Sequence, residues 1–76
     1  MKAYTYQIGD GTGDLMPKPS YSEALYADSL QEAIDKAKAI THRRPLHDKE
    51  NMVRIVESAA DEYPLWASSS EDVRNA

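Results

Sequence analysis

Side chains able to do chemistry are few and scattered in this 76-residue chain. It contains no cysteine, which excludes disulfides, thiolate metal sites and cysteine nucleophiles. The two histidines, His42 and His47, flank Pro45, and nothing in the pattern brings a third or fourth metal ligand to them. The serines at 68–70 lie in a segment with no means of holding a nucleophile against a base. We therefore expect no enzyme activity, no cofactor and no metal.

Three glycines alternate with polar residues in the run Gly-Asp-Gly-Thr-Gly-Asp at 9–14. The spacing is not that of a dinucleotide fingerprint, and Pro17 and Pro19 follow where a helix N-terminus would have to hold the phosphates. Asp10, Thr12 and Asp14 match half of a calcium loop, but the glycine at its sixth position and the closing glutamate are absent. A turn at the end of a strand is the interpretation that we favour.

Charge is distributed unevenly along the chain. Residues 36–49 carry five Lys or Arg and one Asp, whereas residues 55–73 carry five acidic residues and no Lys or Arg. Because the net charge is −4, general nucleic-acid binding is not expected. An acidic segment can instead steer association with a basic protein surface, such as a groove that holds nucleic acid. The plain alternative is two solvated faces of opposite charge.

The acidic segment also contains aromatic residues of the kind that anchor interfaces. Our candidate partner-binding residues are therefore Glu57, Asp61, Glu62, Tyr63 and Trp66. On a strand Leu65 and Trp66 point to opposite faces, and we expect Leu65 toward the helix and Trp66 on the open face. In a chain with so few large apolar residues, Trp66 is also a candidate core residue. The alternative partner-binding site is the basic helix end, Arg43 and Arg44.

Hydrophobic periodicity predicts the elements that position these residues. Residues 3–8 and 52–57 read as strands, the second central because both of its faces are apolar. Residues 29–43 form an amphipathic helix with a capping box of Ser29 and Glu32, packed through Leu30, Ile34 and Ile40. Residues 21–27 favour a strand, although Ser20 and Glu23 have the spacing of an earlier helix start. Residues 64–68 read as an edge strand.

The order β-β-α-β-β predicts an α+β domain over residues 1–68, with a single helix packed on a small antiparallel sheet. Residues 69–76 are expected to form a flexible acidic tail. Leu, Ile and Val together number only 12 and Phe is absent, so we expect tyrosine and tryptophan in the core, or self-association into a homodimer. No apolar run is long enough to span a membrane, and the lack of cysteine favours the cytoplasm.

Several short segments resemble known families. The opening Met1-Lys2-Ala3 with its alternating aromatics and the segments 27–33, 52–55 and 65–67 are similar in layout to small phage-encoded anti-CRISPR inhibitors. That resemblance implies a protein without catalytic residues that binds a nucleoprotein effector complex in the host cytoplasm and blocks its nucleic-acid site or its assembly. A strand that leads into a helix much like the segment 28–40 is found in HicB-type antitoxins. This resemblance covers about a third of the chain and implies neutralisation of a small basic ribonuclease.

Overall fold

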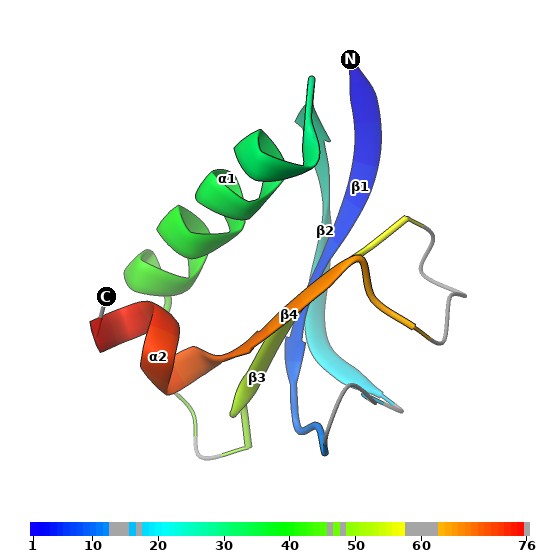
Figure 1. The fold of residues 1–76 in the computed structure, drawn as a ribbon. Helices are drawn as coiled ribbons and strands as arrows, with labels where there is room; N and C mark the ends of the chain where they lie inside the picture. The colour runs from blue at the N-terminus through cyan, green and yellow to red at the C-terminus, as the bar shows by residue number, and fades with distance from the viewer. Residues whose placement is uncertain (13–15, 17, 46, 48, 58–62, 76) are drawn as a thin grey trace.

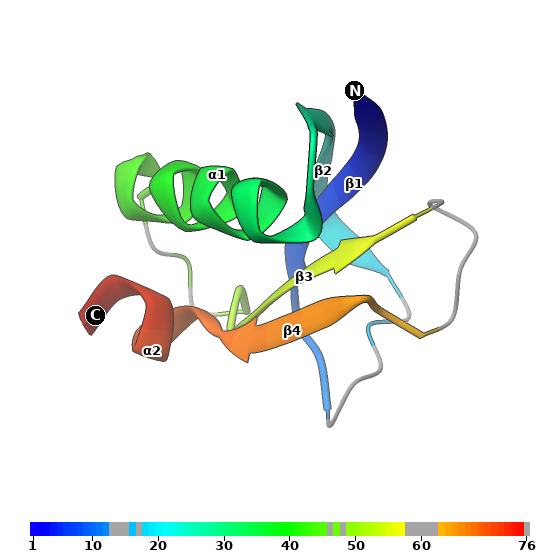
Figure 2. The same ribbon diagram turned by 45° about the horizontal axis from the view of Figure 1, so that its top comes forward.

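The computed structural model of the protein describes residues 1–12, 16, 18–45, 47, 49–57 and 63–75. The strands β1 (Lys2–Gly9), β2 (Pro19–Ala27), β3 (Met52–Val56) and β4 (Trp66–Ser69) form one antiparallel sheet in the order β2-β1-β3-β4. The helix α1 (Leu30–Arg43) covers one face of this sheet, and the short helix α2 (Ser70–Asn75) follows β4 (Figures 1 and 2). The predicted α+β class, with one main helix on an antiparallel sheet, is confirmed.

The uncertain segment at 21–27 is a strand. β2 pairs with β1 from Lys2↔Ala27 to Ile8↔Tyr21, and the register then shifts so that Gly9 lies opposite Pro19. A Cβ on Gly9 would lie only 2.8 Å from the backbone nitrogen of Ser20, so this close approach of the two strands requires glycine. The alternative helix start at Ser20 is therefore wrong.

The helix begins where its capping box predicts. The Ser29 hydroxyl accepts the backbone N–H of Glu32 at 3.2 Å, and the Glu32 carboxylate accepts the backbone N–H of Asp28 at 2.9 Å. The residues that α1 buries are Ala33, Ala37 and Thr41, while Leu30, Ile34 and Ile40 are only partly buried beside them. The contact face is thus centred on the alanines, whose small side chains let the helix approach the sheet closely, and the three larger residues flank it.

The face of the sheet under α1, which we call the helix face, carries the hydrophobic core. Its buried residues include Tyr4, Tyr6 and Ile8 from β1 and Val53 and Ile55 from β3. The Tyr6 hydroxyl is within 2.9 Å of the Thr41 hydroxyl, which itself donates to the carbonyl of Ala37. The tyrosines therefore supply core volume, as the scarcity of larger aliphatic residues predicts.

The opposite face, which we call the far face, is buried along its centre as well. All five residues of β3 are buried, which confirms its predicted central position. Arg54 and Gln7 lie opposite each other there, and the Arg54 Nε donates to the Gln7 side-chain oxygen at 2.6 Å. The core of this small protein thus includes polar side chains joined by hydrogen bonds.

The expected orientation of Trp66 is wrong. Trp66 pairs with Ile55, so it lies on the helix face, where it is partly buried against the core. Leu65 precedes β4 and is 47% exposed. The reason is the register of the β3–β4 pair, which places Trp66 opposite Ile55, a residue of the helix face. The strand itself begins at Trp66 rather than at Pro64. The edge position of this strand is confirmed.

The C-terminal residues differ from the flexible tail that we expected, because residues 70–75 form α2. The Ser69 hydroxyl accepts the backbone N–H of Asp72 at 3.1 Å, which caps the start of this helix. Ser70 and Val73 are buried. Arg74 donates from one nitrogen to the carbonyls of Thr41 and Arg44, at 3.1 and 2.7 Å. These contacts attach α2 to the end of α1 and extend the domain beyond residue 68.

Candidate functional site

The acidic site proposed from the sequence is only partly visible. Asp61 and Glu62 lie outside the described residues. Glu57 is exposed, and Tyr63 is 71% exposed, so both are accessible to a partner. Trp66 contributes mainly to the core. The described part of this surface therefore consists of Glu57 and Tyr63, to which the structure adds the exposed Leu65.

The alternative residues, Arg43 and Arg44, are neighbours with different surroundings. One terminal nitrogen of Arg44 contacts both carboxylate oxygens of Glu50, at 2.9 and 3.2 Å, and the Glu50 side chain is only 5% exposed. The Arg44 guanidinium also lies over the Tyr21 ring, 4.6 Å from its centroid. Its carbonyl accepts from Arg74. Arg44 therefore connects β2, α1, α2 and the segment before β3, and its charge is already matched.

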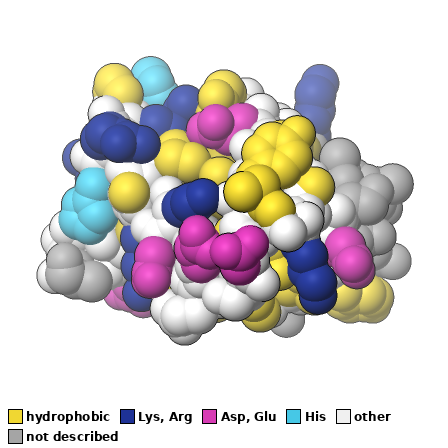
Figure 3. Space-filling model, turned by 90° about the horizontal axis from the view of Figure 1, so that it is seen from above, with side chains coloured by type: hydrophobic (Ala, Val, Ile, Leu, Met, Phe, Trp, Pro, Cys, Tyr) yellow, Lys and Arg dark blue, Asp and Glu magenta, His cyan; other side chains and the backbone are white. Residues whose placement is uncertain are grey.

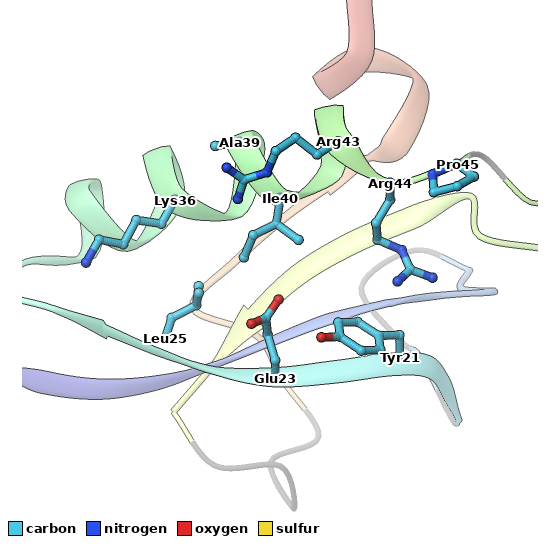
Figure 4. A pocket seen from close by; sticks show the side chains of 9 residues that line it. All are labelled: Tyr21, Glu23, Leu25, Lys36, Ala39, Ile40, Arg43, Arg44 and Pro45. Carbon is cyan, nitrogen blue, oxygen red and sulfur yellow. The ribbon is translucent and has the colours of Figure 1, made fainter.

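Arg43, by contrast, is exposed and has no ion pair with any residue that the structure describes. It lies on the rim of an open groove of about 580 Å³ between α1 and β2 (Figure 4). Lys36, Ile40 and Arg43 line the groove from α1, where their i, i+4, i+7 spacing places them on one side of the helix. Tyr21, Glu23 and Leu25 line it from β2.

The groove runs beside an open edge of the sheet, because β2 is a terminal strand. The Lys36 ammonium donates to the carbonyl of Tyr26, so this carbonyl points away from β1. Backbone direction alternates along a strand, and the N–H and C=O of one residue point to the same side. We therefore assign to the open edge the backbone groups of Ser22, Ala24 and Tyr26, whose side chains are all exposed on the far face.

Two cations of the groove are already neutralised. Lys36 forms an ion pair with Glu32 at 3.7 Å, and Arg44 pairs with Glu50. Glu23 is the one carboxylate among the groove residues, and no cation in the described part of the chain pairs with it. In Figure 3, dark blue Lys and Arg side chains gather with the cyan His side chains at the left of the view, on the side where α1 ends. The lining of the groove therefore contains three cations and one carboxylate, of which Arg43 and Glu23 have no ion pair within the described residues.

Two buried groups have shifted pKa values. Burial raises the pKa of the Tyr6 hydroxyl, while its hydrogen bond with Thr41 and the charge of Arg44 oppose this shift. Burial lowers the pKa of the Arg54 guanidinium. Both side chains belong to the packed interior, and neither lines the groove.

The groove could be found from the sequence only in part. The basic helix end was identified through Arg43 and Arg44, but Lys36, Glu23 and the open edge of β2 were not. The available signal was the spacing of Lys36, Ile40 and Arg43 on one side of the helix. What this arrangement offers chemically is a row of backbone donors and acceptors beside a charged groove, of which the carbonyl of Tyr26 already accepts from Lys36.

We also looked for metal sites and membrane-spanning helices in the described residues, and for similar proteins. They contain no group of three or more His, Asp or Glu side chains placed to hold a metal ion. Neither α1 nor α2 is long and apolar enough to cross a bilayer, and no further helix occurs in the described part of the chain. No family model matches this sequence, and no curated protein or solved structure is significantly similar to it.

Proposed function

We propose that the protein is a non-enzymatic binding protein that takes up an extended segment of a partner protein along the open edge of β2. The observation that carries this proposal is the juxtaposition of a nine-residue edge strand with the basic groove under α1. In recognition by strand addition, backbone hydrogen bonds supply affinity, and pockets for alternate side chains supply specificity. β2 and the groove offer both.

The composition of β2 supports this role. Proteins usually protect edge strands with lysine, proline, charged side chains or bulges. Within β2, Pro19 lies at the first position and Glu23 is the only charged residue. Near the other end of β2, the Lys36 ammonium donates a hydrogen bond to the carbonyl of Tyr26. Between these points the exposed residues Ser22 and Ala24 have small side chains, so a partner backbone can approach them closely.

The proposal also specifies how such a protein inhibits. A captured segment is withheld from the contacts that it makes in its own complex. The effect is inhibition when that segment is needed for the assembly or nucleic-acid binding of the complex. This is the kind of activity that the resemblance to anti-CRISPR inhibitors implies, and it requires no catalytic residue.

Random peptides of about ten residues, displayed and selected on the folded protein, test strand addition directly. The variant Ala24→Pro removes a backbone N–H that we assign to the open edge, and it leaves the β1–β2 ladder intact. Selected peptides should bind this variant about tenfold or more weakly, because a backbone hydrogen bond is lost and the ring obstructs the partner strand. Amide chemical-shift changes on binding should concentrate in residues 20–26.

The matched control is Ala24→Ser, which changes the side chain and keeps the N–H. It should bind the same peptides as the unsubstituted protein does. Both variants should retain the melting temperature within a few degrees, since neither touches the core. Peptides that bind Ala24→Pro with undiminished affinity would show that the edge of β2 is not the binding site, as would a selection that yields no binders.

A second candidate function is supported by the exposed Leu65, which lines the same pocket as Glu57, and by the exposed Tyr63. Large apolar side chains beside acidic ones suit a basic protein surface, and we propose as this partner a nucleoprotein effector complex whose nucleic-acid groove is basic. Measured against an effector complex loaded with guide RNA, Glu57→Lys should slow association, and Tyr63→Ala should speed dissociation. If the unsubstituted protein leaves DNA binding by that complex unchanged, this second candidate fails.

A further inference from the structure

We infer that the groove selects an acidic partner segment, in which every second side chain is a carboxylate that points toward α1. The inference rests on the proposed function, because only a partner that adds a strand to β2 directs alternate side chains toward α1. Successive side chains of a strand point to opposite faces of the sheet. Half of the partner's side chains would therefore enter the groove beneath α1, and the other half would lie on the far face.

The two sides that a partner strand would meet differ chemically. On the side of α1, the groove is lined by Lys36, Arg43 and Arg44 together with Ile40, and Leu25 lies across from the helix on β2 (Figure 4). On the far face, β2 presents Ser22, Ala24 and Tyr26, none of them charged. Carboxylates on the side of the partner strand that faces α1 therefore meet cations. If the partner strand shifts by one residue, the same carboxylates lie on the far face and meet no cation.

Arg43 is the residue that gains most from such a partner. Lys36 and Arg44 already have carboxylate partners, whereas Arg43 has none among the described residues. A guanidinium can hold an incoming carboxylate with two parallel hydrogen bonds. Because Arg43 is exposed, we expect a moderate effect: Arg43→Gln should weaken the binding of an acidic peptide by about threefold. Reversal to Arg43→Glu should weaken it by about tenfold.

Glu23 supplies an internal control of opposite sign. It is the one carboxylate in the groove, so it repels an acidic partner. Glu23→Gln should therefore strengthen the binding of acidic peptides by about threefold. Opposite effects of Arg43→Gln and Glu23→Gln on binding could not arise from a general loss of stability, because such a loss would weaken binding in both variants.

An acidic protein segment fits this surface better than the other available occupants. A second copy of the chain would present β2 with Glu23 as its only acidic residue, and both copies carry a net charge of −4. A nucleic acid could satisfy the cations, but it has no row of alternating N–H and C=O groups to pair with the strand edge. The combination of edge and charge is what an acidic extended polypeptide matches.

Peptides of equal length test the inference. The first alternates glutamate with threonine, the second has the same composition in two blocks, and the third and fourth replace glutamate by glutamine or lysine. We expect affinity to fall in the order alternating glutamate, blocked glutamate, glutamine, lysine. The alternating peptide should bind at least about threefold more tightly than the blocked one, because only half of the blocked glutamates can face α1.

The outcomes separate this inference from the proposal on which it rests. If the glutamate and glutamine peptides bind equally but all lose affinity on Ala24→Pro, strand addition stands and acidic selection is refuted. If the two glutamate peptides bind equally, net charge rather than side-chain direction is responsible, and the inference is again refuted. Undiminished binding to Ala24→Pro refutes both. If single-stranded DNA binds more tightly than the alternating peptide, the occupant of the groove is a nucleic acid and the inference is refuted. If the protein forms a dimer that the peptide cannot dissociate, the occupant is a second copy of the chain, and the inference is refuted as well.

Discussion

Replacing Ile55 with alanine should leave most of the protein unfolded at 37 °C. Ile55 is fully buried in the central strand β3, between Tyr6 of β1 and Trp66 of β4. Truncation of a buried isoleucine typically costs about 2–5 kcal/mol, the lost transfer free energy plus the cost of the cavity. A domain of this size buries little surface, and its free energy of unfolding is expected to lie near the lower end of about 5–15 kcal/mol. One such cavity can therefore remove most of the stability.

Thermal unfolding followed by circular dichroism measures this effect. Leu65→Ala is the matched control, because Leu65 is 47% exposed and its truncation should change the stability by less than about 1 kcal/mol. Ile34→Ala should fall between the two, since Ile34 is only partly buried at the edge of the helix contact. A melting temperature for Ile55→Ala equal to that of the unsubstituted protein would contradict the packing described here.

The elements that the sequence predicted are those whose local and tertiary preferences agree. The start of α1 follows from the capping box of Ser29 and Glu32, and its hydrogen bonds involve residues only three or four positions apart. β1 has strict alternation, and β3 is apolar on both faces, which already indicates a central strand. Each of these patterns is complete within its own segment, so composition and spacing were sufficient.

The errors arise where a distant contact decides the outcome. Trp66 faces α1 because of the register between β3 and β4, and no residue near Trp66 encodes that register. α2 has a local signal in Ser69 and Asp72, but it is fixed in place by the buried Val73 and by the contacts of Arg74 with the end of α1. A short acidic and serine-rich segment resembles a tail unless those partners are known.

Polar residues in the interior were equally hard to anticipate. Gln7, Thr41 and Arg54 are buried, although their residue types indicate surface positions. Their burial is stabilised by specific hydrogen bonds, such as that between Arg54 and Gln7, which join residues 47 positions apart. The candidate site has the same character, because the groove exists only where the edge of β2 meets the last turns of α1.

The sequence could not show that Arg43 and Arg44, two neighbouring arginines, have different roles, one on the surface and one in the fold. We expect the second large effect on stability from Arg44→Gln. This substitution leaves the carboxylate of Glu50 without its cation, at a site where the Glu50 side chain is 5% exposed. Removing one partner of a buried ion pair typically costs about 3–5 kcal/mol. Because the Arg44 side chain is itself 24% exposed, we expect about 3 kcal/mol, at the lower end of that range.

The double variant with Glu50→Gln separates the charge from the packing. If the loss of stability in Arg44→Gln is caused by the unpaired carboxylate of Glu50, then Glu50→Gln should restore much of that stability. A double-mutant cycle should then give a coupling energy above about 1 kcal/mol. Arg43→Gln is the control on the other side, since its guanidinium is exposed and the melting temperature should not change. Equal stabilities for Arg43→Gln and Arg44→Gln would show that the ion pair with Glu50 contributes nothing. If the two differ as expected, any loss of peptide binding in Arg43→Gln reflects the groove itself, whereas a loss in Arg44→Gln also contains the cost of a weakened fold.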